Sequence, residues 1–392
     1  MGVVYPTILL SRTHWRSFPV QVPSTLQTRL WNYFDSSTVW MCRDLSRNEL
    51  VCMKAMVSNY PSVERELRAF ELLATASTLS KTIGKKHVRH AEDQFKLDHA
   101  GRTYQFLIHD PLGFPFSQLH EMPGYTLPLE RAQISVLEVL KAVYYLHINA
   151  HVIHTDIQTR NMLLSVETPE VLTEMEDLEV AQPSARKMTA ETAVFLSREP
   201  YGECERWIGD KSSLVLCDFG EARPGGSSHT GLIQPGPFRA PEVILEIPWS
   251  EPVDIWNVGC VSWNMMFGTH LFPRKASVDN AGEEVKTKED MHHLARMVAL
   301  LGRPPAELLQ KAGPRALHFF YANGTPKVEV PNISFESLLE ENLKRIDQPL
   351  ERERFLRFLR RCLTWTAETR ATVIDLILEY ESWVPKDPQS PM

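Results

Sequence analysis

Three polar side chains in two short stretches of this chain could together carry out phosphoryl-group chemistry. The first stretch, 152–164, holds Asp156 and Asn161 between an apolar entry and an apolar exit. The second, 214–220, is an apolar run that ends in Asp218 and is followed by Phe-Gly. A carboxylate can act as a base, and an amide oxygen together with a second carboxylate can bind a hard cation such as Mg²⁺. The pattern therefore predicts a base, Asp156, and two metal ligands, Asn161 and Asp218, for the transfer of a phosphoryl group.

Two predicted helices lie where they could hold the first stretch in place. Leu129–His147 has the apolar period of an amphipathic helix and precedes it directly. Residues 253–263 are apolar on nearly every side, as a helix at the centre of a domain must be. Asp254, at the start of this second helix, is predicted to bind the backbone of the first stretch. The alternative is an ordinary acid at a helix N-terminus.

A lysine and a glutamate nearer the start of the chain form a further candidate pair. Glu49–Val57 is predicted to be a strand, in which Lys54 is a lone cation among apolar residues. A helix is predicted from Pro61, and at about 100° per residue Glu66 falls inside its apolar face while Glu64 points away. Because a buried lysine needs a counter-ion, Glu66 is the predicted partner of Lys54. The alternative interpretation is an edge lysine whose ammonium reaches solvent.

Taken together, these motifs resemble the signature of the eukaryotic protein kinases, His-x-Asp-x-x-x-x-Asn followed by Asp-Phe-Gly. Val51-Cys-Met-Lys54 is similar to the lysine motif of that family, and Ala240-Pro-Glu242 matches a later one. The resemblance implies that Arg370 is the buried partner of Glu242.

Finer features are similar to the SR-protein-specific kinases of the CMGC group, particularly their divergent fungal members. These features are His-Thr-Asp in place of His-Arg-Asp, a long insertion before Asp218, and the segments 111–113 and 229–244. The segment 293–305 resembles the insert of the wider CMGC group. The resemblance runs from about Thr38 to Trp383. It implies a serine/threonine kinase that uses ATP and Mg²⁺ and acts on protein substrates, arginine/serine-rich ones among them.

The implied fold class is α+β, with a small β-rich N-lobe and a larger, mainly α-helical C-lobe. The predicted boundaries are 1–29 for an N-terminal extension, 30–110 for the N-lobe and 111–385 for the C-lobe. An insertion is predicted at about 165–210. Its centre, 169–187, is acidic and then rich in Pro and Ser, and is predicted to stay without packed structure.

The resemblance also assigns roles to individual residues. Asp156 would accept or orient the substrate hydroxyl, and Asn161 and Asp218 would hold Mg²⁺. Lys54, braced by Glu66, would contact the nucleotide phosphates. Asp110 and Leu112, in a segment predicted to connect the lobes, would also contact the nucleotide.

Two departures from the family's pattern bear on activity. When residues 37–40 are aligned with the end of the family's phosphate loop, the segment 32–37 takes the place of the loop, and it contains no glycine. Gln158 stands where the family has a lysine that neutralises the transferred phosphate. Arg160, two residues later, is the candidate to supply the missing charge, because one group of tyrosine kinases carries an arginine at that position. The alternative is a solvent-facing arginine without a catalytic role.

Composition agrees with a two-lobed globular protein inside the cell. The chain has 392 residues, of which 43% are hydrophobic and 23% charged, and a formal net charge of -7 that argues against nonspecific nucleic-acid binding. The six cysteines show no metal-ligand spacing, and no apolar run is long enough for a membrane span. We expect a monomer in the cytoplasm, the nucleus or both, without direct contacts to nucleic acid or membrane.

Three functions compete at this point. An active serine/threonine kinase is favoured by Lys54, Glu66, Asp156, Asn161 and Asp218. A pseudokinase that serves as a binding scaffold is favoured by Gln158 and by the glycine-free segment. A small-molecule phosphotransferase of the same fold would share the base and the amide, but Ala240-Pro-Glu242 and the segment 293–305 argue for a protein substrate.

Overall fold

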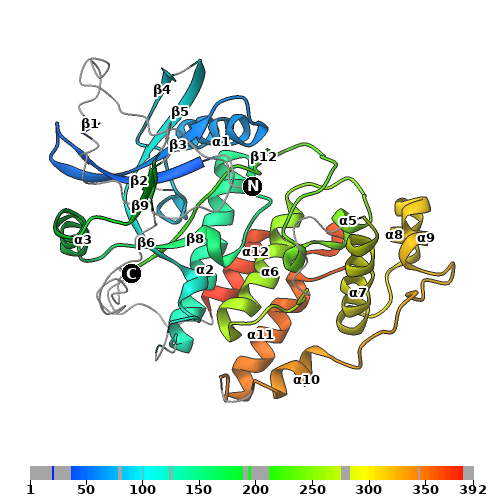
Figure 1. Ribbon diagram of the computed structural model, residues 1–392. Coiled ribbons are helices and arrows are strands. Elements are labelled where there is room, and N and C mark those ends of the chain that lie inside the picture. Colours follow the sequence, from blue (N-terminus) through cyan, green and yellow to red (C-terminus); the bar gives the residue numbers. More distant parts are fainter. Residues whose placement is uncertain are drawn as a thin grey trace. The chain divides into compact units, whose positions relative to one another are not determined.

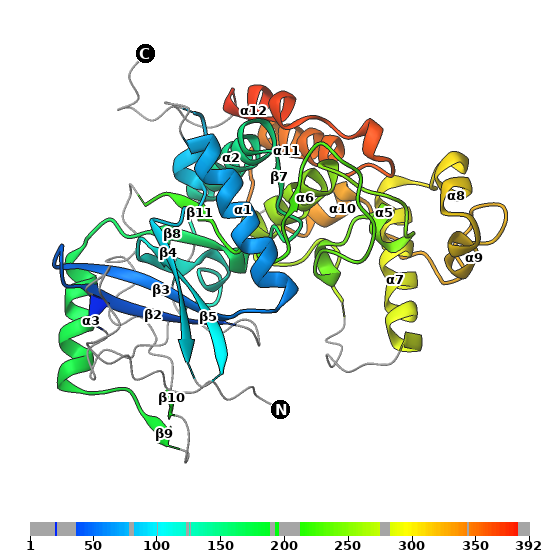
Figure 2. The same ribbon diagram turned by 90° about the horizontal axis from the view of Figure 1, so that it is seen from above.

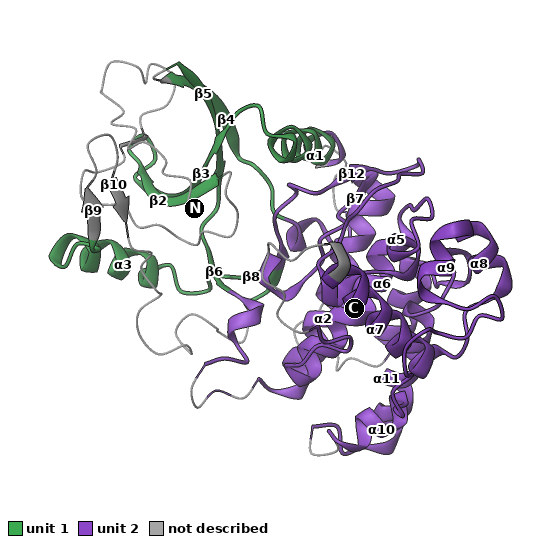
Figure 3. Cartoon of the chain, turned by 45° about the vertical axis from the view of Figure 1, so that its right-hand side comes forward, with its two compact units in different colours: residues 1–74, 89–114, 163–214 green, residues 75–88, 115–162, 215–392 purple. Residues whose placement is uncertain are grey.

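The computed structural model describes residues 20–21, 37–77, 82–99, 101–122, 125, 127–188, 193–195, 212–274, 283–342 and 345–382. The chain divides into two compact units, which Figure 3 shows in different colours. Unit 1 consists of 1–74, 89–114 and 163–214, and unit 2 consists of 75–88, 115–162 and 215–392. The predicted segment 32–37 of the phosphate loop lies outside the described residues, apart from Ser37.

Unit 1 is built on a five-stranded antiparallel sheet with the strand order β1-β2-β3-β5-β4 (Figure 1). The strands are β1 (Val20–Gln21), β2 (Ser37–Asp44), β3 (Glu49–Val57), β4 (Asp93–His99) and β5 (Arg102–His109). In this register Lys54 of β3 pairs with Val39 on one side and Leu107 on the other. Lys54 therefore lies on a central strand, so the alternative of an edge lysine is wrong.

Successive side chains of β3 point to opposite faces of the sheet, and both faces carry buried ones, Val51 and Met53 on one and Cys52 and Met56 on the other. One face carries a core cluster made of Cys42, Val51, Met53, Tyr104, Phe106 and Ile108. Cys52 and Lys54 point to the other face. Helix α1 (Pro61–Ser77) follows β3 and begins at Pro61, as the sequence predicts.

The centre of the insertion folds, and here the sequence prediction is wrong. Residues 170–181 form helix α3 (Glu170–Ala181), which buries Val171 and Met175. Arg43 of β2 forms a two-pronged ion pair with Glu176 of this helix. A short antiparallel pair follows, β9 (Arg186–Met188) with β10 (Ala193–Phe195).

The division into units places two segments differently from the predicted lobe boundaries. Residues 163–214, which contain the insertion, group with unit 1 and not with the larger lobe. Residues 75–88 group with unit 2 because the turn at Gly84 packs on helix α2. A Cβ at Gly84, whose φ is +86°, would lie 1.7 Å from the carbonyl oxygen of Lys141 in that helix, so only glycine fits there.

Unit 2 is mainly helical and surrounds the buried helix α6, in which every residue from Val253 to Met266 is buried. Figures 1 and 2 show α2 beside α6 and α12, and α11 beside α6. The helices are α2 (Leu129–Tyr144), α5 (Pro241–Ile244), α6 (Pro252–Phe267), α7 (Glu283–Leu301), α8 (Ala306–Ala312), α9 (Ala316–Phe319), α10 (Phe335–Glu340), α11 (Pro349–Cys362) and α12 (Val373–Glu381). The predicted helix at the centre of a domain is thereby confirmed.

Short strands frame the stretches that carry the candidate chemistry. A three-stranded sheet has the order β11-β8-β6, made of β11 (Leu214–Leu216), β8 (Met162–Ser165) and β6 (Leu112–Pro115). A two-stranded sheet pairs β7 (Val152–Ile153) with β12 (Arg223–Pro224). Among the helices that the structure describes, none has the length and apolar character needed to cross a membrane.

Candidate active site

The stretch around Asp156 is a loop that runs from the buried strand β7 to the strand β8. It leaves α2 through a π-helical turn, Tyr145–Ala150, and then passes through the buried strand β7. Thr155 is fully buried and adopts the left-handed backbone conformation, with φ 66°. The chain therefore turns directly before Asp156. A short 3-10 turn, Thr159–Asn161, then leads into β8.

Asp254 holds this loop by its backbone, as predicted. One carboxylate oxygen of Asp254 accepts a hydrogen bond from the backbone N–H of His154 at 2.7 Å, and the other from that of Thr155 at 2.8 Å. His147 adds a contact from its Nε2 at 2.9 Å. Because Asp254 is fully buried in α6, the loop is fixed to the centre of unit 2.

His154 connects the loop to the stretch that carries Asp218. Its Nε2 lies 3.1 Å from the carbonyl oxygen of Cys217, and its Nδ1 accepts the backbone N–H of Asp156 at 3.2 Å. Burial lowers the pKa of His154, which agrees with a neutral ring that carries its proton on Nε2. The ring also contacts that of the buried Phe219, with 5.1 Å between the centroids.

The carboxylate of Asp156 is bound by two side-chain amides. Nε2 of Gln158 donates to its Oδ1 at 2.7 Å, and Nδ2 of Asn161 donates to its Oδ2 at 2.7 Å. Burial, and next the negative charge of Asp218, raise the pKa of Asp156 to about 7. The two amide hydrogen bonds and the charge of Arg160 act in the opposite direction.

Asp218 lies close to Asp156 and Asn161, as the sequence pattern predicts. The backbone N–H of Cys217 donates to the carbonyl oxygen of Asn161 at 2.7 Å, which joins the two stretches directly before Asp218. Asp218 itself has a left-handed backbone with φ 67°, and its Oδ1 accepts the N–H of Gly220 at 3.2 Å. A non-glycine residue seldom takes this conformation, so the surrounding contacts must hold it there.

The donor set around Asp156 fits a hard cation. The charge of Asp218 raises the pKa of Asp156, so the two carboxylates are near enough to repel each other. The amide nitrogen of Asn161 is engaged by Asp156, which leaves its oxygen as the atom for a metal. A divalent cation would relieve the repulsion between the carboxylates.

The predicted lysine–glutamate pair is present in unit 1. Nζ of Lys54 lies 2.7 Å from Oε1 and 2.8 Å from Oε2 of Glu66, and both side chains are largely buried. The helical phase that placed Glu66 toward the sheet is thereby confirmed. Asp110, between β5 and β6, is exposed, and its carbonyl oxygen accepts a bond from Arg89 at 3.2 Å. Leu112 begins β6 and is half-buried.

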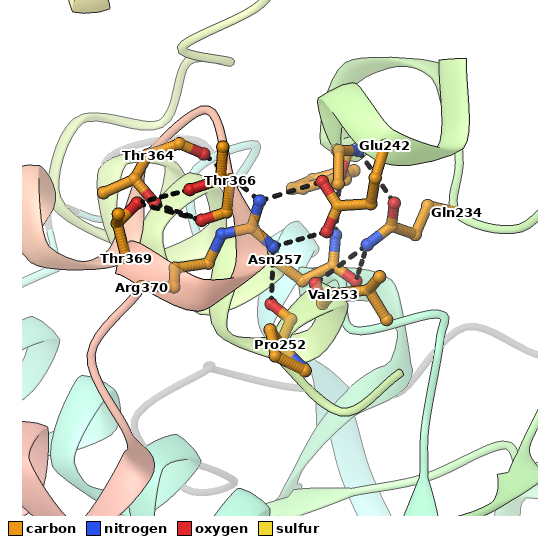
Figure 4. Close-up of polar contacts among 11 residues, drawn as sticks. Gln234, Glu242, Pro252, Val253, Asn257, Thr364, Thr366, Thr369 and Arg370 are labelled. Carbon is orange, nitrogen blue, oxygen red and sulfur yellow. Dashed lines mark hydrogen bonds and ion pairs between the residues drawn. The ribbon is translucent and has the colours of Figure 1, made fainter. Parts of the chain in front are cut away.

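A second polar network of unit 2 fixes the segment around Ala240-Pro-Glu242 (Figure 4). Arg370 forms a buried two-pronged ion pair with Glu242, at 2.6 and 2.8 Å, and also donates to the carbonyl oxygen of Pro252. This confirms the partner that the resemblance implied for Glu242. Gln234, which sequence reasoning did not single out, donates to Val253 O at 2.9 Å and Asn257 Oδ1 at 3.1 Å.

Comparison with known proteins agrees with this geometry. The protein kinase domain family matches residues 35–381. This chain belongs to the protein kinase family. It is 34% identical over 349 residues to a serine/threonine protein kinase of Aspergillus fumigatus, covering 88% of this chain and 80% of that protein.

More distant relatives agree with the family. The human dual specificity protein kinase CLK2 is 29% identical over 258 residues, which are 65% of this chain and 40% of CLK2. The serine/threonine-protein kinase AFC1 of Arabidopsis thaliana is 26% identical, covering 71% of this chain and 52% of that protein. A crystal structure of a kinase domain shares the fold with a TM-score of 0.61 at 20% identity, covering 89% of this chain and 92% of that one.

Gln158 and Arg160 differ in their burial and in their contact with Asp156. Gln158 is buried and bound to Asp156, whereas Arg160 is exposed in the following turn. The charge of Arg160 nevertheless lowers the pKa of Asp156, so its guanidinium is close enough to influence the base. Sequence reasoning noted that Gln158 can donate a hydrogen bond but brings no charge, and it did not foresee the contact with Asp156.

Proposed function

We propose that this kinase transfers the γ-phosphoryl group of ATP to serine or threonine hydroxyls of protein substrates. The observation that carries the proposal is the carboxylate of Asp156, held by Gln158 and Asn161 beside a second carboxylate, Asp218. This arrangement supplies a base and a cation site in one loop system. The names of the similar proteins support the choice of serine and threonine.

Each residue has a distinct task in the proposed reaction. Asp156 orients the substrate hydroxyl and takes its proton as the hydroxyl attacks. Asn161 and Asp218 would bind Mg²⁺, and Lys54, braced by Glu66, would bind the phosphates. Bound ATP with Mg²⁺ would supply the phosphoryl group and neutralise its charge. Asp110 and Leu112 are proposed to contact the nucleotide outside the reacting groups.

We further propose that arginine/serine-rich proteins are among the substrates. The support is the sequence resemblance to the SR-protein-specific kinases, together with a formal net charge of -7 that would favour basic peptides. Turnover of an arginine/serine-rich peptide should exceed that of the same peptide with lysine in place of arginine. Equal turnover of both would limit the proposal to serine/threonine transfer.

A loss-of-function pair tests the proposed reaction. Asp156→Ala should abolish transfer, because it removes the base, while nucleotide binding with Mg²⁺ should persist. Asp218→Ala should remove the Mg²⁺-dependent part of nucleotide binding, measured by thermal shift with and without the metal. Asp347→Ala, at an exposed position of unit 2, is the matched control and should behave like the wild type.

The alternative of a binding scaffold predicts a different outcome. Gln158 in place of the lysine and the glycine-free segment 32–37 favour it. In that case the wild type and Asp156→Ala would show the same background transfer. A wild-type rate well above that of Asp156→Ala excludes the scaffold as the sole function.

A further inference from the structure

The side chain of Gln158 is buried and reaches back to the carboxylate of Asp156. Its Nε2 donates to Oδ1 of Asp156 at 2.7 Å. The family's lysine at this position brings a positive charge, whereas an amide brings only a hydrogen-bond donor. The contact therefore cannot neutralise the transferred phosphate and must be judged by what it does to Asp156.

The carboxylate of Asp156 has one amide donor on each oxygen. Gln158 occupies Oδ1, while Asn161 occupies Oδ2 at 2.7 Å and also the carbonyl oxygen of Asp156 at 3.0 Å. Rotation of the carboxylate about its Cβ–Cγ bond would break both side-chain hydrogen bonds together. With Asn161 alone, only one side-chain hydrogen bond would oppose this rotation.

The loop aims Gln158 by fixing the residues on both sides of it. Ile157 before it is fully buried, and Thr159 after it donates from Oγ1 to Asn264 in α6 at 2.8 Å. Gln158 has an extended backbone, with φ -152° and ψ 156°, and its carbonyl oxygen accepts the N–H of Asn161 at 2.9 Å. The amide that reaches Asp156 is thus held by anchors outside the site.

We propose that Gln158 is a positioning residue that, with Asn161, holds the carboxylate of Asp156 in the single orientation from which it receives the substrate hydroxyl. This inference rests on the proposed function. A base contributes only when it is aimed at the proton that it takes, and a small misplacement of reacting groups costs a large factor in rate. Each carboxylate oxygen keeps a further acceptor position after binding one amide, so the clamp leaves room for the hydroxyl.

Three substitutions separate positioning from simple packing. Gln158→Met keeps the length of the side chain but removes the donor. Gln158→Glu keeps the shape and places a second carboxylate against Asp156. Gln158→Lys replaces the amide donor by an ammonium donor within reach of Asp156. Gln310→Glu, at an exposed glutamine of α8, is the matched control for the change of charge.

The proposal predicts a loss in kcat without a loss in binding. Losing a hydrogen bond to a charged group should lower kcat of Gln158→Met by about 10- to 100-fold. Gln158→Glu should lose at least as much, while Gln158→Lys should retain most of the wild-type kcat and Gln310→Glu all of it. KM for ATP and KM for the peptide should stay near wild-type values in all four variants. The melting temperature of the nucleotide-free protein should stay near the wild-type value in Gln158→Met, Gln158→Lys and Gln310→Glu, whereas the added buried carboxylate should lower it in Gln158→Glu.

A second readout tests the contact itself without turnover. In protein labelled with ¹⁵N-glutamine, the side-chain amide signal of Gln158 is assigned by its absence in Gln158→Met. That signal should shift in Asp156→Ala and should stay in place in Asp347→Ala. An unchanged signal in Asp156→Ala would overturn the contact and the proposal with it.

The kinetic outcomes are equally decisive. Wild-type kcat in both Gln158→Met and Gln158→Glu would overturn the positioning role while leaving the proposed function intact. A fall in kcat accompanied by an equal loss of nucleotide affinity and a lower melting temperature would assign Gln158 to packing and also overturn it. A wild type that transfers no phosphate to any protein substrate would remove the proposed function, and this inference would fall with it.

Discussion

Arg160 is the one arginine or lysine of the stretch 152–164, and it follows Gln158 by two residues. Its side chain is exposed, yet its charge lowers the pKa of Asp156. If Gln158 orients the base, the charge that stabilises the transferred phosphate must come from another group. The planar guanidinium of Arg160 can bind phosphate oxygens in pairs, and an exposed arginine can turn toward a bound nucleotide.

We therefore expect Arg160→Ala to lower turnover far more than it lowers ATP affinity. Removing one charge that acts on the transition state costs about 3 kcal/mol of barrier, which corresponds to roughly a hundredfold in rate. Adding Gln158→Lys should partly restore the rate, because it returns a cation near the base. The checks are kcat and the dissociation constant for ATP, with Arg303→Ala as the exposed control. Unchanged turnover in Arg160→Ala would show that Arg160 does not supply the positive charge that stabilises the transferred phosphate.

At the scale of elements, the segment after Asp218 is held by contacts that need no phosphate. Oγ1 of Thr155 donates to the carbonyl oxygen of Glu221 at 2.7 Å. Further along, His229 and Trp249 exchange both backbone hydrogen bonds, at 2.8 and 2.9 Å. Kinases switched by phosphorylation of this segment use an arginine beside the catalytic aspartate, where this chain has Thr155.

Activity is therefore expected to be independent of phosphorylation in this segment. The triple change of Ser227, Ser228 and Thr230 to Ala should leave kcat close to the wild-type value, since none of the backbone contacts depends on these hydroxyls. Phosphatase treatment of the wild type should likewise leave the rate unchanged. A rate that falls more than about tenfold in either measurement, a loss of more than about 1.4 kcal/mol, would show that a phosphate orders the segment.

Helix α3 determines what shortening the insertion should do to stability. Its apolar stripe is short, because the third buried position of the repeat after Val171 and Met175 is Glu179. Glu179 is nevertheless satisfied, since its carboxylate accepts bonds from the backbone N–H and the hydroxyl of Ser184, both at 2.7 Å. A stripe that includes an acid is invisible to a count of apolar residues, which is why composition failed here.

Excision of residues 169–187 should consequently lower the melting temperature. The point change Met175→Ala should cost about 2–4 kcal/mol of unfolding free energy, because it leaves a cavity at a buried position. Thr173→Ala, on the exposed side of the same helix, is the control and should change stability by less than about 0.5 kcal/mol. Urea unfolding measures the free energy of both point variants. A Met175→Ala protein as stable as the wild type would show that the packing of Met175 does not contribute to the stability of unit 1.

For the whole molecule, the sequence predicted those features whose signals are local. The pairing of Lys54 with Glu66 follows from a strand and the phase of one helix, and Asp254 follows from its place at the start of a buried helix. The contacts of Gln234 with Val253 and Asn257 join separate segments through side chains that carry no pattern. Such contacts depend on packing, which no single stretch of sequence specifies.

The buried His293 should make the stability of unit 2 depend on pH. His293 of α7 lies against Phe272, with 5.0 Å between the ring centroids, and its Nε2 lies 3.1 Å from the carbonyl oxygen of Arg239. Burial lowers the pKa of His293 to about 3, helped by the charges of Arg274, Arg239 and Arg296. An ordinary histidine has a pKa of about 6.5. As the pH falls, the unfolded chain therefore takes up a proton at this residue at a much higher pH than the folded protein does.

The sign of the effect follows from this difference in proton uptake. Stability from a neutral buried histidine is complete above about pH 6.5 and declines as the pH falls toward 3, by at most about 1.4 kcal/mol per pH unit for one group. His293→Phe keeps a ring beside Phe272 but cannot titrate. We expect it to lose about 1 kcal/mol at pH 7.5, for the missing hydrogen bond, and to show a shallower decline between pH 6.5 and 4.5. Urea unfolding at four pH values measures this, with the exposed His292→Asn as control. Parallel pH curves for His293→Phe and the wild type would show that other groups cause the loss of stability in acid.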